Sequence, residues 1–382
     1  MNILNICLAG PYSDGWNYQD NLLTKYQKLN GNNVTILTSR WIWNNAGVLT
    51  LTNKENYTNE DGVRVIRVPM KGVENFNKKI KRYKTIEQHI EEVNPDVIFV
   101  HGCQFIDIKK VAQYAKKHKV KIFVDNHADF SNSAKNWLSK KILHGIIWKK
   151  CAKIIEPFTA KFFGVLPARV DFLINVYKIP KNKVELLVMG VDDELAEIAK
   201  KESKEKIRKK YGIKNTDFLI ISGGKIDPAK SQVLTLINAI RSIKDANVKL
   251  LLFGSIDENM KKQVLEKCDN KKIKYIGWLN TLDMYKLIHS SNLAVYPGRH
   301  SVIWEQTVGL GLPMIAKYWD GTTHIDIGGN VKYIYDDTVE EMKKAIEGVL
   351  NIRTYRAMTA SANSKRRKMF SYRKIAQQSI HI

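Results

Sequence analysis

Hydrophobic and polar positions alternate along the first half of the chain in a pattern that predicts strands and helices in turn. Helices are predicted where apolar residues recur at helical spacing, as in 18–30. Such segments lie between most of the predicted strands, which are the short apolar runs at 2–9, 33–39, 63–69, 96–102, 120–126 and 153–157. Short apolar strands separated by amphipathic helices are typical of a parallel sheet that is covered on both faces. The first half is therefore predicted to be an α/β domain.

The pattern restarts in the second half of the chain. A lysine-rich segment at 200–212, with charges paired at i and i+4, predicts a helix, and it precedes an apolar strand at 217–224. Strand and helix then alternate to residue 350, and the last helix begins with the capping-box pair Thr338 and Glu341. We therefore expect two doubly wound, Rossmann-like α/β domains that join near residue 190.

The fold class indicates where ligands bind. In open parallel sheets, ligands lie outside the carboxyl ends of the strands, where loops and helix N-termini converge. Two such domains that face each other would place both sets of loops on one interdomain cleft. The candidate residues are therefore those in the strand-to-helix loops.

Length and composition agree with a two-domain cytoplasmic protein. The chain has 382 residues, more than the roughly 250 to 300 at which a single core stops growing. Its first apolar run is too short for a signal peptide, and no run approaches the roughly 18 to 20 apolar residues that cross a bilayer. The four cysteines are far apart and form no C-x-x-C pair, which argues against a zinc site and a disulfide framework.

The formal net charge of +24 favours anionic partners, such as nucleic acid, acidic lipid surfaces or phosphorylated small molecules. A lysine-rich composition throughout the chain explains the same charge equally well. No nucleic-acid recognition motif accompanies it, so nucleic acid is not expected as a partner.

The loop at 9–17 is a weak candidate for ligand binding. It contains Gly10 and Gly15 but not the G-x-G-x-x-G pattern, which disfavours a dinucleotide-dependent dehydrogenase. Gly15 would open a helix whose unpaired N–H groups bind an anion or a sugar. A plain tight turn is an equally good interpretation.

The loop after the strand at 217–224 is more informative. Gly223 and Gly224 would let the backbone approach a ligand closely, while Lys225 and Lys230 flank the start of the next helix. Dipole and ammonium groups would then converge on one spot, as a pyrophosphate requires. Two solvated lysines in a lysine-rich chain are about as good an explanation.

Two histidines follow predicted strands directly. His127 comes after the strand at 120–126, with Asp129 close by, and His101 has a similar position. Lone histidines are more often structural than functional, and neither belongs to a metal-like cluster. No D-x-D pair occurs in the chain, so phosphate chemistry is expected to rely on lysines and helix termini, with neither a metal nor another cofactor.

Residues 296–316 form a mostly apolar segment that contains one acid, Glu305, beside Trp304. A charge that leaves water without a partner costs roughly several kcal/mol. A neighbouring cation, a helix N-terminus or a ligand hydroxyl must therefore bind Glu305.

The segment 133–153 is rich in lysine and contains no acid, and its lysines are interleaved with tryptophan, leucine and isoleucine. A basic amphipathic helix of this kind suits the surface of an anionic membrane. An ordinary helix packed on the sheet, with a lysine-rich outer face, is the alternative.

Several segments, in order, resemble glycosyltransferases of the GT-B architecture and are most similar to glycosyltransferase family 4, the group 1 glycosyl transferases. Met189 replaces an asparagine of that family and Lys225 replaces an arginine. The matching segments cover nearly the whole chain; they are 10–39, 186–194, 222–232, 273–298, 304–316 and 370–378.

The resemblance implies a domain organisation and a reaction. Residues 1–190 would form the acceptor domain and 191–355 the donor domain, and 356–382 would form a C-terminal helix that returns to the first domain. The enzyme would move a sugar from a nucleotide-diphosphate donor, commonly UDP-linked, to a glycan or lipid-linked acceptor in cell-surface polysaccharide or glycolipid synthesis, usually with retention. A nucleotide-sugar epimerase or phosphorylase on the same architecture is the alternative, and a basic nucleic-acid-binding protein is a remote one.

The resemblance also implies roles for single residues. Lys225 and Lys230 would neutralise the diphosphate leaving group, where charge develops in the transition state. The remaining donor contacts would be the loop glycines Gly223 and Gly224, backbone groups of Trp278 and Leu279 at the base, Glu305 at the ribose, His127 at the donor sugar, and Gly15 against the diphosphate when the cleft closes.

The chain departs from the family pattern just before Glu305. An earlier glutamate that the family usually has falls on Pro297 here, which weakens the inference of retention. We expect His300, or the backbone amides of residues 301–303, which include Ser301 and Val302, to take its place.

The sequence does not identify the acceptor. The loop 38–47 would help to set it, and Trp41 and Trp43 in this loop would either stack on sugar rings or pack in the core. Together with segment 133–153, these features predict a bacterial or archaeal enzyme that is peripheral at the cytoplasmic face of a membrane.

Overall fold

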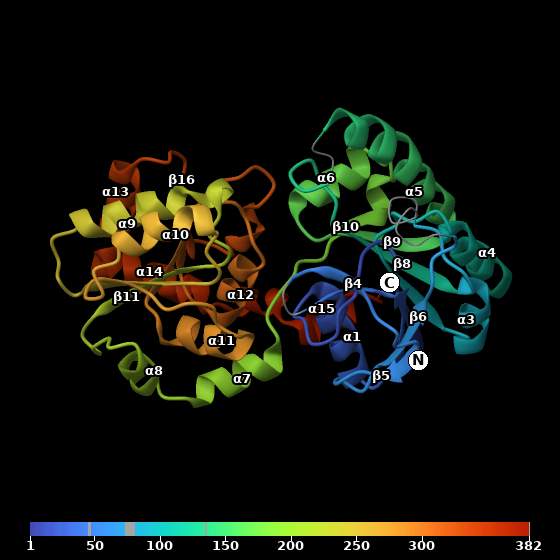
Figure 1. Ribbon diagram of the computed structural model, residues 1–382, viewed down its shortest axis with the longest axis horizontal. Coiled ribbons are helices and arrows are strands. Elements are labelled where there is room, and N and C mark those ends of the chain that lie inside the picture. Colours follow the sequence, from blue (N-terminus) through green and yellow to red (C-terminus); the bar gives the residue numbers. More distant parts are fainter. Residues whose placement is uncertain (45–46, 73–80, 134–135, 382) are drawn as a thin grey trace. The chain divides into compact units, whose positions relative to one another are not determined.

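The computed structural model describes residues 1–44, 47–72, 81–133 and 136–381, and it divides into two compact units (Figure 1). Unit 1 comprises Met1–Val188 and Tyr372–Ile382, and unit 2 comprises Met189–Ser371. Each unit contains one large, predominantly parallel sheet with helices between its strands, which confirms the expected α/β class.

Unit 1 contains an eight-stranded sheet in the order β10-β9-β8-β7-β1-β2-β6-β5. Neighbouring strands are parallel except for β5 and β6, and β3 and β4 form a separate antiparallel hairpin. The strands are β1 (Asn2–Cys7), β2 (Asn33–Ser39), β3 (Trp41–Trp43), β4 (Leu49–Leu51), β5 (Asn56–Thr58), β6 (Arg64–Val68), β7 (Val97–His101), β8 (Lys121–Asn126), β9 (Thr159–Gly164) and β10 (Val184–Leu186). The helices are α1 (Gln19–Leu29), α3 (Ile86–Val93), α4 (Ile108–His118), the π-helix η1 (Ser139–Trp148), α5 (Lys149–Ile155), η2 (Glu156–Phe158), α6 (Pro167–Asn175), η3 (Lys181–Lys183) and α15 (Tyr372–Gln378).

Unit 2 contains a six-stranded parallel sheet in the order β13-β12-β11-β14-β15-β16. Its strands are β11 (Phe218–Gly223), β12 (Val248–Phe253), β13 (Ile273–Tyr275), β14 (Leu293–Tyr296), β15 (Met314–Lys317) and β16 (Val331–Ile334). Its helices are α7 (Asp193–Lys201), α8 (Lys204–Lys210), η4 (Pro228–Lys230), α9 (Gln232–Ser242), α10 (Glu258–Glu266), α11 (Thr281–Ser290), α12 (Ile303–Leu310), η5 (Thr323–Ile325), α13 (Val339–Leu350), α14 (Ile352–Ala362) and η6 (Lys365–Phe370).

The central strands explain why the apolar runs of the sequence are continuous rather than alternating. Strands β1, β7 and β12 are buried at almost every position. Continuous burial is expected where helices cover both faces of a parallel sheet. The hydrophobic runs therefore specify these strands directly.

Each sheet contains a topological switch point, where strands later in the sequence are added on the opposite side of the first strand. In unit 1, β1 lies between β2 and β7; in unit 2, β11 lies between β12 and β14. The connections on the two sides of such a point lead away from each other, which leaves a crevice outside the carboxyl ends of the strands. The crevice of unit 2 lies beyond Gly223 and Tyr296, and that of unit 1 lies beyond Cys7 and His101.

The C-terminal segment is shorter than expected. Residues 356–371 belong to unit 2, where the carbonyl of Phe370 accepts a hydrogen bond from the backbone N–H of Val191 at 2.7 Å. Helix α15 belongs to unit 1 because the Tyr372 ring stacks on Tyr26 of α1, with 6.4 Å between centroids. The boundary after the first domain lies at Val188 rather than at residue 190.

Two predicted elements are wrong. Residues 153–157 were expected to form a strand, but α5 continues to Ile155 and strand β9 begins only at Thr159. Burial of Cys151, Ala152 and Ile155 follows helical spacing, and Pro157 disfavours further helix before it. The predicted helix 200–212 is interrupted, because Ser203 accepts a hydrogen bond from the Lys206 N–H and starts α8 as its N-cap.

His144, on the buried side of η1, makes the stability of unit 1 sensitive to acid. Its ring nitrogens hydrogen-bond the hydroxyls of Ser133 and Tyr177, both at 2.8 Å. Burial, aided by the positive charge of Lys81, lowers the pKa of His144 from 6.5 to about 4. Between these two values the unfolded chain takes up a proton that the folded protein does not, so the free energy of unfolding should fall by about 1.4 kcal/mol per pH unit as the pH drops from about 6.5 to 4.

Denaturant unfolding of the wild type and of His144→Gln, measured at several pH values, checks this prediction. The variant should be less stable near pH 7 but should lose less stability on acidification, because glutamine does not titrate. Equal slopes for the two proteins would contradict the assignment.

Candidate functional site

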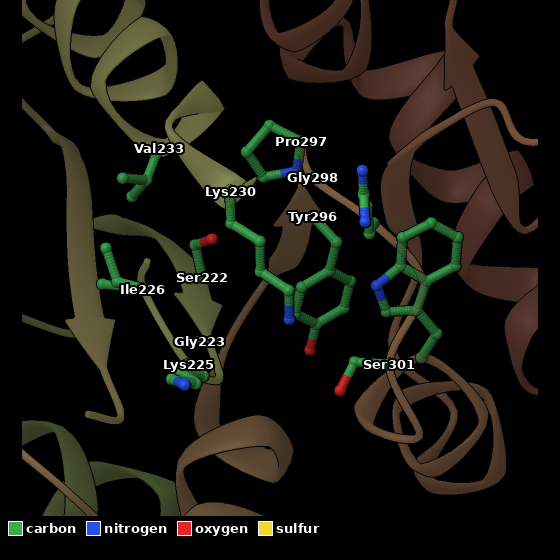
Figure 2. Close-up of a pocket in the computed structure, with 12 residues that line it drawn as sticks. Ser222, Gly223, Lys225, Ile226, Lys230, Val233, Tyr296, Pro297, Gly298 and Ser301 are labelled. Atoms are coloured by element: carbon green, nitrogen blue, oxygen red, sulfur yellow. The ribbon is translucent and has the colours of Figure 1, made fainter. Parts of the chain in front are cut away.

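A small pocket lies at the switch point of the unit 2 sheet (Figure 2). It is formed by the end of β11, the loop before α9, the end of β14 and the loop before α12. Its volume is about 30 Å³, room for one or two water-sized groups rather than for a whole nucleotide. Its lining residues are Ser222, Gly223, Lys225, Ile226, Lys230, Val233, Tyr296, Pro297, Gly298, Arg299, Ser301 and Trp304.

The expected lysine pair lines this pocket, but the two side chains differ. Lys230 extends beside Tyr296 in Figure 2, and its stem packs against Gly298. Burial, with the nearby charge of Lys225, lowers the pKa of Lys230 despite the opposing effect of Asp227. Lys225 has a side chain that is 66% exposed and faces the Asp227 carboxylate at 3.8 Å. Lys230 is therefore the cation that the fold holds in the pocket.

Gly223 has a packing role that the sequence does not show. It lies beside Phe253 of β12, and a Cβ at Gly223 would lie 2.2 Å from Cζ of that ring. Packing therefore excludes a side chain here, and the expected approach of a ligand stays a prediction. Gly224 has a φ of +112° with open space around its Cα, so the turn itself requires glycine there.

We expect Gly223→Ala to lower the free energy of unfolding by about 1–3 kcal/mol, since overpacking of this kind forces Phe253 or the backbone to shift. Denaturant unfolding measures the loss. Gly10→Ala is the matched control, because a Cβ there meets nothing within 4 Å. A change below about 0.5 kcal/mol for Gly223→Ala would contradict the packing argument.

Trp278 and Leu279 do not line the pocket, but their loop is tied to it. The Gly254 N–H donates to the Gly277 carbonyl at 2.9 Å, and a Cβ on Gly254 would lie 2.0 Å from the Gly224 carbonyl oxygen. The turns after β11, β12 and β13 therefore pack directly on one another. Trp278 is 73% exposed beside this stack, where a planar ligand can contact it.

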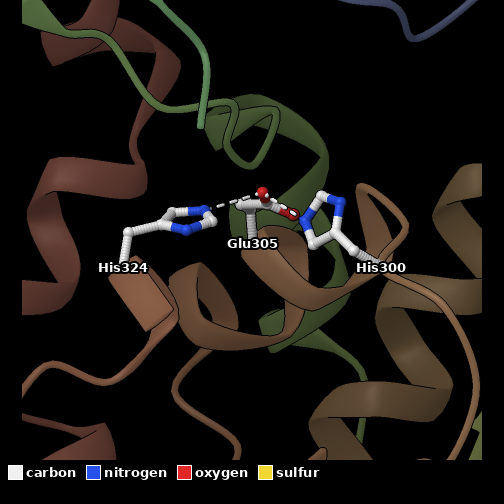
Figure 3. Close-up of side chains that lie close together, drawn as sticks. All are labelled: His300, Glu305 and His324. Atoms are coloured by element: carbon white, nitrogen blue, oxygen red, sulfur yellow. Dashed lines mark hydrogen bonds and ion pairs between the residues drawn. The ribbon is translucent and has the colours of Figure 1, made fainter. Parts of the chain in front are cut away.

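Two histidines are the partners of Glu305 that the sequence left open. Glu305 lies in the first turn of α12, fully buried, with its carboxylate between two imidazole rings (Figure 3). Nε2 of His300 and Nε2 of His324 lie 2.7 Å and 2.9 Å from the same oxygen, Oε1. An ionised carboxylate only accepts hydrogen bonds, so both rings carry their donated proton on Nε2.

The two rings keep Glu305 ionised. Burial favours the neutral acid, but the charge and hydrogen bond of His300 and those of His324 outweigh burial and hold the pKa of Glu305 at about 2. The second oxygen, Oε2, is buried and has no hydrogen-bond partner among the described residues. Glu305 therefore retains one acceptor atom that its neighbours do not use.

His300, Glu305 and His324 also form a group that can be considered for metal binding. Their ligand atoms lie within 4.8 Å of one another. Ligand atoms around a tetrahedral zinc ion are about 3.3 Å apart, since each bond is about 2.0–2.1 Å long. The two nitrogen-to-oxygen distances, 2.7 Å and 2.9 Å, are those of hydrogen bonds, so the trio fits a hydrogen-bonded support better than a coordination shell.

The expected substitutes for the missing glutamate separate into two groups. Ser301 lines the pocket, together with Pro297 and Arg299. His300 points instead to Glu305, and Val302 is the N-cap of α12. His300 therefore contacts Glu305 and does not line the pocket itself.

A second titratable cluster lies at the crevice of unit 1. Oδ2 of the buried Asp125 is 3.0 Å from Nδ1 of His101 and 3.2 Å from Nε2 of His127. Burial opposes both charges, but the two histidines lower the pKa of Asp125, while Asp125 and Asp20 raise the pKa of His101. His127 has a side chain that is 42% exposed, so its ring is available to a ligand.

Gly15 and Asp129 each have a partner within unit 1. Helix α1 begins only at Gln19, and the Gly15 N–H donates to the Glu60 carboxylate, so it is not an unpaired helix N-terminal group. Asp129 pairs with Arg169 at 3.1 Å and caps its own loop by accepting from the Ser131 N–H. The expected role of Gly15 at the diphosphate stays a prediction.

The sequence pattern did not mark His324, Asp125 or Tyr296 as candidate site residues. Asp125 and Tyr296 lie at or near the carboxyl ends of mostly apolar strands. A polar residue at such a position can indicate a ligand site, because ligands bind beyond the carboxyl ends of strands at a switch point. His324 lies in the short turn η5, and no periodicity marks it.

Comparisons with known proteins relate part of the chain to a family and the whole chain to a fold. Residues 203–366 match the family model for glycosyl transferases group 1. No curated protein sequence matches the chain. The fold is similar to that of Anabaena Alr3699/HepE in complex with UDP (TM-score 0.67, 13% identity, 99% of this chain and 98% of that one).

Two further solved structures share the fold. One is WaaG, a glycosyltransferase involved in lipopolysaccharide biosynthesis (TM-score 0.65, 15% identity, 99% of this chain and 100% of that one). The other is UDP-GlcNAc 2-epimerase from Neisseria meningitidis bound to UDP-GlcNAc (TM-score 0.61, 13% identity, 99% of this chain and 98% of that one). Residues 203–366 thus match the glycosyl transferases group 1, and the chain as a whole has the GT-B fold of these solved structures.

Proposed function

We propose that the enzyme transfers a sugar from a UDP-sugar to a glycan or lipid-linked acceptor, without a metal and with retention. The observation that carries the proposal is the position of Lys230: a partly buried ammonium in a pocket at the switch point of the domain that matches the family. The likeness to Anabaena HepE, whose solved structure is a complex with UDP, supports a uridine nucleotide.

The pocket suits one phosphoryl group of the diphosphate rather than the nucleoside. Its small volume fits a phosphoryl group, and Lys230 would stabilise the negative charge that builds up on the leaving diphosphate. Lys225, which is more exposed, would contribute a weaker, screened interaction. A metal ion, and the pair of acidic residues that would bind it, is not needed when lysine ammonium groups neutralise the diphosphate.

The nucleoside would extend from the pocket over the loops after β13 and β14. Backbone groups of Trp278 and Leu279 are proposed to contact the base, and Oε2 of Glu305 is proposed to accept a ribose hydroxyl. This use of Oε2 would satisfy a buried polar atom that has no described protein partner. His127, exposed and held by Asp125, is the candidate for contact with the donor sugar.

We also propose that segment 137–153 docks the enzyme on an anionic membrane. No helix among the described residues is long and apolar enough to cross a bilayer, so attachment would be peripheral. Trp137 and Ile146 are 70% and 63% exposed, and Lys140 and Lys141 are exposed between them. Residues 134–135 of the expected segment lie outside the described residues.

Replacing Ile146 by glutamate is expected to reduce binding to phosphatidylglycerol-containing vesicles at least about tenfold, because burial of one such side chain contributes about 1.5–3 kcal/mol. Vesicle sedimentation measures the binding. Leu265→Glu, in unit 2, is the matched control and should bind normally. Equal binding of the wild type to neutral and anionic vesicles would contradict the proposal.

The reaction itself is tested by UDP release from UDP-glucose, UDP-galactose and UDP-N-acetylglucosamine in EDTA, with and without methyl pyranosides as acceptors. We expect release that depends on an acceptor, and NMR of the product should show a retained anomeric configuration. An epimerised sugar, or release without any acceptor, would favour the epimerase alternative, whose fold is shared by the N. meningitidis enzyme.

A further inference from the structure

Unit 1 contains a groove that none of the roles above uses. It has a volume of about 550 Å³, within the range of about 300–1,000 Å³ that is typical of small-molecule sites. The loop after β1, the hairpin β3–β4, the segment that follows the hairpin and strand β6 form its walls. The groove lies entirely within unit 1.

Two tryptophans line this groove. Trp43, at the end of β3, is 36% exposed, and Trp16 lies in the loop after β1, with its ring 5.1 Å from that of Tyr18. Trp41, two residues before Trp43, is buried at 7% exposure and packs in the core. Of the two tryptophans of the hairpin, Trp41 therefore belongs to the core, whereas the indole of Trp43 is accessible to a ligand.

Asp14 gives the groove a polar acceptor. Its Oδ2 accepts a hydrogen bond from the Tyr57 hydroxyl at 2.7 Å and lies 3.7 Å from Nη2 of Arg67. Its Oδ1 is buried and has no hydrogen-bond partner in the part of the chain that the structure describes. A buried carboxylate oxygen of this kind is costly unless a donor reaches it, and a ligand hydroxyl is such a donor.

The groups are held in place before any ligand arrives. Arg67, which orients Asp14, donates to the carbonyls of Tyr12 and Ser39 at 3.1 Å and 2.9 Å. The backbone N–H of Trp43 donates a hydrogen bond to Ser13 Oγ at 2.8 Å, which connects the hairpin to the loop that contains Asp14. Rigid positioning reduces the entropy that binding must overcome.

We propose that this groove binds a pyranose ring of the acceptor. The polarised C–H groups of a pyranose pack on the electron-rich face of an indole, and its hydroxyls donate to a carboxylate. Trp43 and Trp16 supply the face, and Oδ1 of Asp14 receives a hydroxyl. That the bound sugar is the acceptor rests on the proposed function; that the groove binds a sugar does not.

Saturation-transfer NMR on the full chain tests the groove. The probes are the methyl glycosides of glucose, galactose, mannose, rhamnose, N-acetylglucosamine and glucuronic acid. We expect ring protons of at least one probe to receive saturation, and we expect Trp43→Ala and Asp14→Asn each to weaken that binding at least about tenfold. Tyr335→Ala removes an exposed aromatic ring of unit 2 and should leave sugar binding unchanged.

UDP-induced thermal stabilisation provides the folding control for each variant. Trp43→Ala should keep it, because the UDP pocket lies in unit 2. Saturation of none of the probes in the wild type, or unchanged binding by Trp43→Ala, would overturn the inference. Sugar binding that depends on Trp43 in a protein that does not bind UDP would instead count against the proposed function alone.

Discussion

Replacement of Lys230 by alanine is expected to weaken UDP binding about 10- to 150-fold and to lower kcat/KM further. Hydrogen bonds to charged groups contribute about 1.5–3 kcal/mol, which gives this range of affinity. The effect on kcat/KM is larger because the charge on the diphosphate grows in the transition state. Isothermal calorimetry measures the affinity, and initial rates of UDP release measure kcat/KM.

Two other lysines provide controls for this prediction. Lys225→Ala should have a smaller effect, since Lys225 is mostly exposed and faces Asp227. Lys262→Ala removes a lysine that is 86% exposed on α10 and should change nothing. Equal losses for Lys225→Ala and Lys230→Ala would show that net charge, and not the pocket, determines binding.

Removal of the Glu305 carboxylate should have the largest effect on stability. Glu305→Ala leaves two largely buried imidazole N–H groups without their shared acceptor, and each buried donor that loses its acceptor costs about 1–3 kcal/mol. For a domain of this size, the melting temperature should fall by roughly 10 °C. Glu305→Gln retains one acceptor oxygen and should cost less. Differential scanning calorimetry distinguishes the two variants.

The contribution of Glu305 to the stability of the folded protein is expected to decrease at low pH. Its folded pKa of about 2 lies below the ordinary value of 4.5, so the stabilisation is complete above about pH 4.5 and is lost as the pH falls toward 2. A Glu305→Ala protein that melts within about 2 °C of the wild type at pH 7 would contradict this account of the trio.

The role of Glu305 in binding can be separated from its role in stability. Glu305→Gln should bind UDP more weakly than the wild type does, if Oε2 accepts a ribose hydroxyl. That difference should shrink for 2′,3′-dideoxy-UDP, which lacks the donor groups. An equal loss for both nucleotides would assign Glu305 to support of the loop alone.

The sequence predicted those parts of the site that depend on local chain order. Gly224, Lys225 and Lys230 lie in one strand-to-helix loop, so their position at the end of β11 follows from the apolar run before them. The need of Glu305 for a partner also followed from its apolar surroundings. The identity of that partner did not, because His324 reaches it from a turn beyond β15.

Other features depended on packing between distant elements. The reason for Gly223 is the ring of Phe253 on the neighbouring strand, and no local pattern shows that contact. Trp41 and Trp43 were indistinguishable in the sequence, and strand alternation does not separate them either, because residues two apart share a face. Their different burial depends on position along β3: Trp41 packs on the core cluster of unit 1, whereas Trp43 is the last residue of the strand and is exposed.

A crystal structure of the protein with UDP, grown in EDTA, would show whether Lys230 holds the diphosphate. We expect the diphosphate within hydrogen-bond distance of Lys230 Nζ, at the ends of β11 and β14, with a ribose hydroxyl near Oε2 of Glu305. A diphosphate bound away from Lys230, or bound only through an added metal ion, would rule out this role of Lys230.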